Sequence, residues 1–496
     1  MASVGGNHPV ALILVSFCRE TRRFGSATVL QRLGFRAMKD LSLNDDKGSN
    51  SMHAAMMNIG INFHPYGNHP ASWIVADAPL GAEVNVNHYV NVAQIAEGGL
   101  LDFVFFADVP AIRDGSIEAT SRWPLYAAQF EPVSVLGALS VATSAIGIAA
   151  TVSTSFCEPY NVARQFASLD HLSHGRVGVN VVTTSQPAAA FNFGNAPRSE
   201  HADRYARAKE FVAILSGLWS SWDEDAFLHD RSTGRFFDPV KLHRLDFSGQ
   251  HFSVRGPLNV PRTPQGQPVI IQAGGSGAGR ELAAGAADVI FTSERTLEQG
   301  RQFYFDVKAR LEKYGRSPDD VKILSGIHPI VGRTRSEAED RLGRLNESLH
   351  SAVGREILSI DLDYVDLSDV MDDDPFPTSR IPAGTEGGKS FLGHVRKIVE
   401  EGNPTLRDVY ERYAIGRGGN VVVGSPTDIA DLMEQWFKEQ AADGFMLGIS
   451  YLPSGLTDFV ELVVPELQRR GLFRKAYSGR TLREHLGLKR RGGIAT

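Results

Sequence analysis

Short hydrophobic runs alternate with helical patterns along the middle of the chain. Residues 133–142 and 160–172 carry apolar side chains at helical spacing, whereas residues 146–152 and 177–182 are short and almost wholly apolar. Such runs are typical of parallel strands covered on both faces. Small polar residues end both runs: Thr151, Ser153 and Thr154 in the first, and Asn180, Thr183 and Thr184 in the second. The pattern predicts a parallel α/β barrel with its ligand site where the strands end.

The same alternation recurs over most of the sequence. Strands are predicted at residues 58–63, 102–107, 146–151, 177–182, 268–273, 289–292, 323–331 and 444–449. Eight buried strands separated by helices close a (β/α)8 TIM barrel, an α/β fold. Helix ends agree with this division, because Ser425-Pro426 is typical of a helix start, and Asp443-Gly444 and His174-Gly175 are predicted to end helices.

Two connections are far longer than ordinary βα loops. One follows strand 4 and contains residues 227–266, with a possible hairpin strand at residues 251–254. The other follows strand 7 and contains an acidic stretch at residues 361–374. Long insertions at this face of a barrel form lids or substrate walls, or else oligomer contacts and surface loops. Both interpretations remain open from the sequence.

The first 55 residues show no sustained periodicity. Val10–Phe17 imitates the core of a signal peptide, but no basic segment precedes it and no small-residue cleavage site follows it. Met56 and Met57 stand directly before the first strand. We predict that residues 1–56 are an extension outside the fold, that residues 57–488 form the barrel domain, and that residues 489–496 are a tail. Our hypothesis for the extension is translation from a start upstream of the true one.

Composition excludes several classes of protein. The formal charge is −6, and basic residues gather only at Lys489-Arg490-Arg491, which disfavours a nucleic-acid partner. No segment approaches the roughly 20 apolar residues of a membrane helix. Two cysteines, Cys18 and Cys157, cannot form a disulfide framework, which predicts a reducing, cytoplasmic location. A His-Glu-x-x-His motif is absent, so metal catalysis is disfavoured.

The sharpest local motif follows the fifth predicted strand. It reads Gly274-Gly275-Ser276-Gly277-Ala278-Gly279-Arg280-Glu281 and opens a helix. Helix-start amides, the Ser276 hydroxyl and the Arg280 guanidinium would suit a phosphate. No register of the glycines gives the dinucleotide fingerprint. Ser276 also resembles a hydrolase nucleophile, although the final glycine of that motif is missing. A third interpretation is that the glycines only let strand and helix pack closely.

Two other strand ends carry candidate ligand groups. Asp108 ends the second strand, where its carboxylate can accept hydrogen bonds from a ligand or cap the following loop. Thr151 and Ser153 are two residues apart on a strand and face the same way. Their hydroxyls could bond a heterocycle or a neighbouring backbone group.

Histidines give weaker signals. His201 and Tyr205 lie one turn apart on one helix face, where they could contact a phosphate or a flat ring, or serve packing. His64 and His69 lie in the loop after the first strand. They could reach the pocket, but we expect them to be solvated.

A series of motifs between residues 57 and 488 resembles one enzyme family. They include Leu101-Asp102-Phe-Val-Phe-Phe-Ala-Asp108, Ala163-Arg164-x-Phe-Ala-Ser-Leu-Asp-His171, His201-x-Asp-Arg-Tyr205, Gln272-Ala-Gly-x-Ser276 and Pro465-Glu-Leu-Gln-x-Arg-Gly-Leu472. In order and spacing they resemble the bacterial luciferase-like flavin monooxygenases. The most similar branch contains the nitrilotriacetate, EDTA, dibenzothiophene-sulfone and long-chain-alkane monooxygenases. Residues 1–55 have no counterpart in that pattern.

The resemblance implies an FMN-dependent monooxygenase of a two-component system. Reduced FMN would come from a separate NAD(P)H-dependent flavin reductase, and with O2 it would oxygenate small organic substrates, including xenobiotic compounds. A homodimer or homotetramer is expected. The positions that match flavin contacts of the family are Asp108, Thr151, His201, Tyr205 and Ser276, with Asn180 as a further contact. No metal is expected, and no catalytic acid or base can be assigned beyond a guess at His64.

Three alternatives remain at this stage. A deazaflavin-dependent oxidoreductase would use the same barrel without oxygen or a reductase. A serine hydrolase would use Ser276 as nucleophile. A non-catalytic relative would bind flavin without turnover. The substrate is not readable, because residues 227–266 and 352–403 show mixed charges and no clear anion site.

Overall fold

The structure is a computed structural model that describes residues 56–75, 77–184, 186–194, 201–383 and 389–491. All structural statements below concern these residues. The predicted extension at residues 1–56 lies outside them except for Met56, so it stays a prediction.

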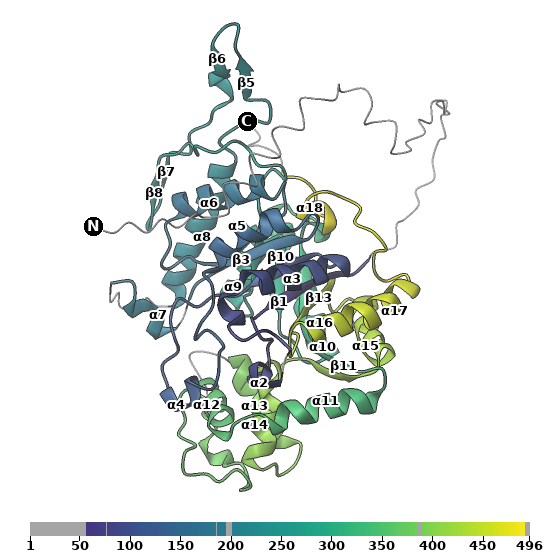
Figure 1. Ribbon diagram of the computed structural model, residues 1–496. Helices are drawn as coiled ribbons and strands as arrows, with labels where there is room; N and C mark the ends of the chain where they lie inside the picture. Colours follow the sequence, from purple (N-terminus) through teal and green to yellow (C-terminus); the bar gives the residue numbers. More distant parts are fainter. Residues whose placement is uncertain (1–55, 76, 185, 195–200, 384–388, 492–496) are drawn as a thin grey trace, which may run out of the picture. The chain divides into compact units, whose positions relative to one another are not determined.

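Eight parallel strands form a closed barrel (Figure 1). They are β1 (Asn58–Phe63), β2 (Phe103–Phe106), β3 (Gly147–Ser153), β4 (Val177–Val182), β9 (Val269–Gln272), β10 (Val289–Thr292), β11 (Lys322–Val331) and β13 (Gly444–Leu447). Each pairs with the next in this order, and β13 pairs with β1 to close the ring. The predicted (β/α)8 barrel is therefore confirmed.

Successive side chains of each strand point alternately into the barrel and out toward the helices, which gives an inner and an outer layer of side chains. Inside the barrel, Phe103 and Phe105 of β2 pack with Ala149 of β3 and Met446 of β13. The intervening residues face outward into the larger cluster that the helices complete. The helices over the barrel are α3 (Val86–Gly98), α5 (Pro132–Ala142), α6 (Pro159–Leu172), α8 (His201–Trp219), α9 (Gly277–Ala286), α10 (Leu297–Arg310), α15 (Pro426–Lys438), α16 (Ser454–Asp458), η8 (Phe459–Val463) and α17 (Val464–Arg469).

Helix α18 (Leu482–His485) closes the N-terminal end of the barrel. Its Leu482 joins the interior cluster. Next to it, Arg483 pairs with the buried carboxylate of Asp288 at 2.9 Å, and Arg491 pairs with the same carboxylate at 2.7 Å. This end of a TIM barrel serves stability rather than chemistry.

The insertion after β4 forms two small hairpins. Strands β5 (Phe227–Asp230) and β6 (Arg235–Phe237) form one, which projects at the top of Figure 1, and β7 (Phe247–Ser248) and β8 (Ser253–Val254) form the other. A strand was predicted at residues 251–254, and the structure confirms it for Ser253 and Val254 only. Two short helices, α7 (Pro187–Phe191) and η3 (Pro239–Lys241), also lie in this insertion.

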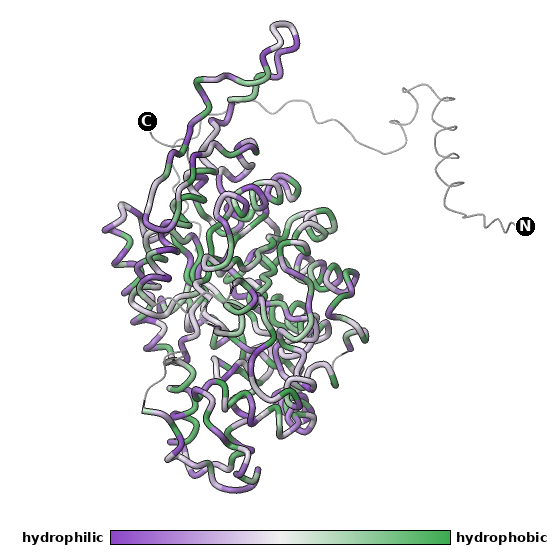
Figure 2. The backbone as a smooth tube through the Cα atoms, turned by 90° about the vertical axis from the view of Figure 1, so that its left-hand side faces the viewer, coloured by the Kyte–Doolittle hydropathy of each residue, from purple (hydrophilic) through white to green (hydrophobic). Residues whose placement is uncertain are grey.

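The insertion after β11 forms a helical cap at the C-terminal end of the barrel. Its helices are α11 (Arg335–Glu347), α12 (Ser351–Asp361), η6 (Thr378–Arg380), α13 (Lys389–Glu400), α14 (Leu406–Ala414) and η7 (Gly416–Gly418). Leu358, Val395 and Tyr410 form part of a core that also takes in Ala71 and Trp123 from the loops after β1 and β2. Figure 2 shows hydrophobic stretches within these helices as well as within the barrel. The insertion therefore covers strand ends rather than standing apart from them.

Two features differ from the sequence-based expectation. A ninth strand, β12 (Val421–Gly424), pairs only with the outer half of β11, from His328 to Val331. Asp443-Gly444 does not end a helix: α15 already ends at Lys438, and Gly444 begins β13. The glycine is needed for a different reason, because a Cβ at Gly444 would collide with the carbonyl oxygen of Asn58 on β1.

Short elements complete the chain. They are α2 (Ser72–Val75), η2 (Ala82–Val84), α4 (Ile117–Thr120), η4 (Leu311–Tyr314) and η5 (Pro318–Asp320). After α6, His174 and Gly175 both have positive φ, 56° and 91°, so the turn predicted there is confirmed. None of the helices in the described ranges is long and apolar enough to span a membrane.

Candidate active site

Polar side chains from β3 and β4 meet inside the mouth of the barrel. Thr151 and Asn180 are register partners, and Asn180 Nδ2 donates to Thr151 Oγ1 at 3.1 Å. Both are buried, and within the described chain Asn180 Oδ1 has no hydrogen-bond partner. A buried acceptor without a donor is costly unless a ligand supplies one. The pair is thus suited to the N–H or hydroxyl edge of a bound heterocycle.

Asp108 stands just beyond the end of β2, the neighbouring strand. It is half-buried, and burial, together with the negative charge of Glu131, raises the pKa of its carboxyl group. Its Oδ1 accepts a long bond of 3.5 Å from Gln129 Nε2. Asp108, Thr151 and Asn180 therefore follow one another at the ends of β2, β3 and β4.

The glycine-rich motif forms the turn between β9 and α9. Ser276 is the N-cap of α9, and its Oγ accepts from the backbone N–H of Gly279 at 3.1 Å. The first amides of the helix are left without intrahelical partners, as at every helix start. A Cβ at Gly274 would lie 2.9 Å from the Gly279 Cα, so this glycine is needed for packing. A Cβ at Gly275 or Gly277 would meet open space, which leaves the turn accessible to a ligand.

The side chain of Tyr205 reaches this turn from α8. Ser276 Oγ donates to Tyr205 Oη at 3.5 Å. Two hydroxyls and the start of α9 thus come together as a phosphate site would require. His201 is the first residue of α8, but its side chain lies outside the described part of the chain.

Arg280 does not take the role in phosphate binding that the sequence suggested. Its Nε donates to the Gly275 carbonyl at 3.0 Å, and its NH1 pairs with Asp306 on α10 at 2.9 Å. The guanidinium therefore holds the turn from behind instead of facing a ligand.

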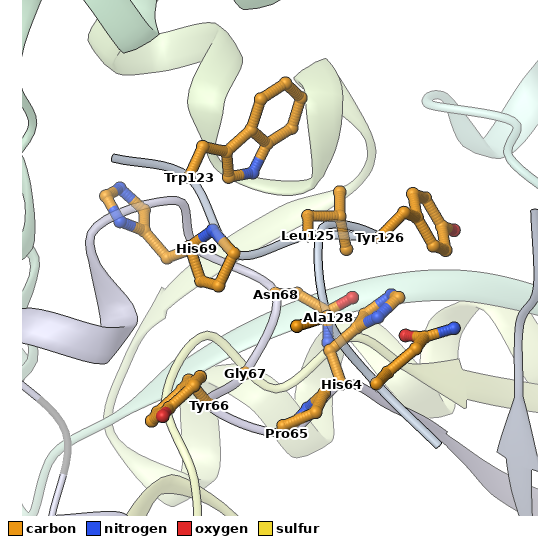
Figure 3. Close-up of a pocket in the computed structure, with 12 residues that line it drawn as sticks. His64, Pro65, Tyr66, Gly67, Asn68, His69, Trp123, Leu125, Tyr126 and Ala128 are labelled. Carbon is orange, nitrogen blue, oxygen red and sulfur yellow. The ribbon is translucent and has the colours of Figure 1, made fainter. Parts of the chain in front are cut away.

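The loops after β1 and β2 enclose a cavity, which we call the loop cavity. It is lined by residues 64–69 and 123–126 together with Ala128 and Gln129 (Figure 3). The expectation that His64 and His69 are solvated is wrong, because they are only 5% and 2% exposed. Packing of the helical cap against these loops explains their burial.

The two histidines differ in their contacts. His69 Nδ1 accepts from the backbone N–H of Ala71 at 3.1 Å and so holds its own loop. His64 has a 3.4 Å contact from Nε2 to Asn62 Nδ2, while its buried Nδ1 has no partner among the described residues. Burial, and secondly the charge of Arg113, lower the pKa of His64 to about 4. The imidazole is therefore neutral at neutral pH and is available to a ligand in the cavity.

Sequence reasoning missed three groups near the mouth of the barrel: Arg113, Arg417 and His328. The ring of His328 lies inside the mouth, and its Nδ1 donates to the Gly448 carbonyl at 3.2 Å. Burial lowers the pKa of His328 to about 4. The available signal was one histidine inside the apolar run of β11, and the two arginines gave none.

A family model described as luciferase-like monooxygenase matches residues 71–444. The chain belongs to this family.

Individual luciferase-like monooxygenases match nearly the whole barrel domain. An N-acetyl-S-(2-succino)cysteine monooxygenase of Bacillus subtilis (strain 168) is 46% identical over 432 residues, covering 87% of this chain and 96% of the relative. Nitrilotriacetate monooxygenase component A of Aminobacter aminovorans is 43% identical over 440 residues, covering 88% of this chain and 97% of the relative. The protein is therefore a flavin-dependent monooxygenase, as the motifs implied.

A solved structure agrees with this assignment. The crystal structure of a riboflavin lyase with modified FMN and the substrate riboflavin superimposes with a TM-score of 0.77 at 30% identity. The match covers 88% of this chain and 96% of that chain. The TIM barrel and its family are thus supported by sequence and structure together.

Proposed function

We propose that the protein binds reduced FMN at the C-terminal strand ends and uses it with O2 to oxygenate a small organic substrate. A separate NAD(P)H-dependent flavin reductase supplies the reduced FMN. The observation that carries the proposal is the accessible turn at the start of α9, where Ser276 and Tyr205 meet. The names of two relatives support it, since one is a component A and the other was solved with a modified FMN.

The residues at the mouth fit the two ends of FMN. Ser276, Tyr205 and the first amides of α9 would hold the phosphate, which carries negative charge suited to a helix start. Asn180 Oδ1, which has no donor in the described chain, would accept from the flavin ring, with Thr151 and Asp108 beside it. His201 remains a predicted contact.

The flavin supplies the oxygen chemistry when bound, and the chain supplies position and shielding. The helical cap, with Trp123 packed into its core, covers the strand ends and limits the access of water. The neutral His64 can donate or accept a hydrogen bond at Nδ1 without bringing a second positive charge near Arg113.

Ser276→Ala tests the phosphate contact. The variant loses a hydroxyl at the helix start, so we expect the Kd for FMN to rise about tenfold, which corresponds to about 1.4 kcal/mol. Isothermal titration calorimetry with FMN measures the change. Ser248→Ala, at an exposed serine of β7, is the matched control and should leave the Kd unchanged. Equal affinities of the two variants would contradict the assignment.

Ser276→Ala also separates the monooxygenase from a serine hydrolase. The Ser276 hydroxyl contacts Gly279 and Tyr205, and no histidine of the described chain is bonded to it. A monooxygenase should keep turnover in Ser276→Ala at saturating FMN, whereas a hydrolase would lose it.

The cofactor itself is tested by anaerobic binding and oxygen consumption. Reduced FMN should bind, and a reduced deazaflavin should not support substrate-dependent oxygen uptake. Oxygen uptake with a flavin reductase, NADH and FMN that rises on addition of substrate would also dispose of a non-catalytic flavin-binding role. The predicted homodimer or homotetramer is checked by analytical ultracentrifugation.

A further inference from the structure

We propose that the substrate is a carboxylate and that Arg113 holds its anionic end next to the loop cavity, beside the flavin site. The inference rests on the proposed function and names the class of substrate for the same site.

Arg113 is a partly buried cation flanked by two aromatic rings of the loop cavity. Its guanidinium carbon lies 5.4 Å from the centre of the Trp123 ring and 5.3 Å from that of Tyr126. The Tyr126 ring in turn contacts His64 edge-on, with 5.5 Å between ring centres. Figure 3 shows His64 and Tyr126 approaching each other from the two loops. Arg113 thus lies against two of the aromatic side chains that line the cavity, although it is not itself a lining residue.

The charges around Arg113 do not balance. Arg417, whose charge also acts on Tyr126, is paired with Asp361, and its Nε donates to that carboxylate at 2.6 Å. Tyr413 donates to the same carboxylate at 2.7 Å. Arg113 has no such partner: among the described residues no carboxylate pairs with it, and its buried Nε–H donates to no acceptor. One cation is therefore in excess.

An unpaired cation removed from water is expensive, and a bound anion would offset that cost. Carboxylates suit the planar guanidinium fork better than other small anions except phosphates. The volume of the loop cavity is about 20 Å³. That is enough for one small polar group.

The position of the cavity places the rest of such a substrate near the flavin. Gln129 lines the cavity, and its Nε2 also donates to Asp108 Oδ1 at the end of β2. A molecule anchored at Arg113 can therefore extend past Gln129 to the strand ends. The unpartnered Nδ1 of His64 is a second contact inside the cavity.

Matched ligands test the proposal on the FMN-loaded full chain. The probes are N-acetyl-S-(2-succino)cysteine, nitrilotriacetate and succinate, together with the neutral methyl esters of all three. We expect at least one acid to bind in calorimetry, and its ester to bind at least about tenfold more weakly, because the ester cannot form charge-assisted bonds. Equal binding of acid and ester, or no binding of any acid, would overturn the proposal.

Variants assign the effect to Arg113. We expect Arg113→Gln to raise the Kd of the acid about 10-fold to 100-fold and to leave that of its ester unchanged. Arg113→Lys, which keeps the charge, should restore part of the affinity. The control is Arg122→Gln, since Arg122 is an exposed arginine just after α4 that pairs with Glu118 of that helix. A purely structural role of Arg113 would change acid and ester binding alike, which would count against the proposal.

The failure of this inference can be told apart from failure of the proposed function. FMN binding to Arg113→Gln should equal that of the wild-type chain. If reduced FMN binds and a neutral substrate is oxygenated while no carboxylate binds, the carboxylate site is refuted and the monooxygenase stands. If the wild-type chain does not bind reduced FMN, the proposed function itself fails. The comparison of acid with ester still reports on the wild-type chain if Arg113→Gln does not fold.

Discussion

Replacing Asp288 by alanine lowers the free energy of unfolding by about 3–5 kcal/mol. The Asp288 carboxylate is 2% exposed, and it accepts from Arg483, from Arg491 and from the backbone N–H of Ile270 at 2.9 Å. Burial alone would raise the pKa of Asp288, but the two arginine charges hold it well below its ordinary value. Without the carboxylate, the buried Arg483 is left uncompensated at the closed end of the barrel. Equilibrium unfolding in urea, followed by circular dichroism, measures the loss.

Glu281→Ala is the matched control for Asp288→Ala. Glu281 lies on α9 and also pairs with two cations, Arg310 and Lys313, but at the surface. Solvent screens such pairs, so this variant should unfold close to the wild-type midpoint. Because Asp288 is at the N-terminal end of the barrel, folded Asp288→Ala should keep the wild-type Kd for FMN. Equal urea midpoints for the two variants would contradict the importance given to burial.

The barrel was readable from the sequence because its strands are buried on both faces. The strands β1, β4 and β10 have the predicted bounds, since each is a short, mostly apolar run that a polar residue follows directly. The ninth strand, Val421–Gly424, was missed because four residues that pair with one neighbour leave too little pattern. The helical cap could be recognised only as a long insertion.

The parts of the candidate site that lie at strand ends could be predicted from the sequence. Asp108, Thr151 and Asn180 follow strands, and ligands of parallel barrels bind at strand ends. His64, His69 and Arg113 could not be placed, because their burial depends on a cap that lies hundreds of residues further along the chain. Arg280 was misassigned because its pairing with Asp306 on another helix leaves no local signal.

Acidification from pH 6.5 toward pH 4 should destabilise the protein strongly. Burial is the main cause that lowers the pKa of His64, His69, His328 and His394 to about 4 in each case. In the unfolded chain these groups titrate near 6.5. Between the two values the unfolded state binds protons that the folded state does not bind. Stability is therefore fully present above about pH 6.5 and is lost as the pH falls toward 4.

Carboxyl groups whose pKa is raised by burial oppose this trend; they are Asp108, Glu294, Glu411 and, with the one large shift among them, Asp170. Burial raises the pKa of Asp170 to about 6, so the folded state holds a proton there that the unfolded state releases above about pH 4. The stability that Asp170 gains on acidification cancels at most the stability that one of the four histidines loses. Each remaining histidine contributes a slope of up to about 1.4 kcal/mol per pH unit. The net effect within this window is loss of stability on acidification.

Urea midpoints at pH 6.5, 5.5 and 4.5 check the slope for the wild-type chain and for His328→Gln. His328 is chosen because its ring lies inside the barrel mouth, between Gly448 and the η7 turn. Glutamine does not titrate, so His328→Gln should lose stability less steeply, by up to one proton, whatever its midpoint at pH 6.5. A flat midpoint in the wild-type chain would show that these histidines are not buried in the neutral form. If His328→Gln has the same slope of stability against pH as the wild-type chain, His328 is not one of the histidines with a lowered pKa. Such a result would also contradict the enclosure of this imidazole by the cap.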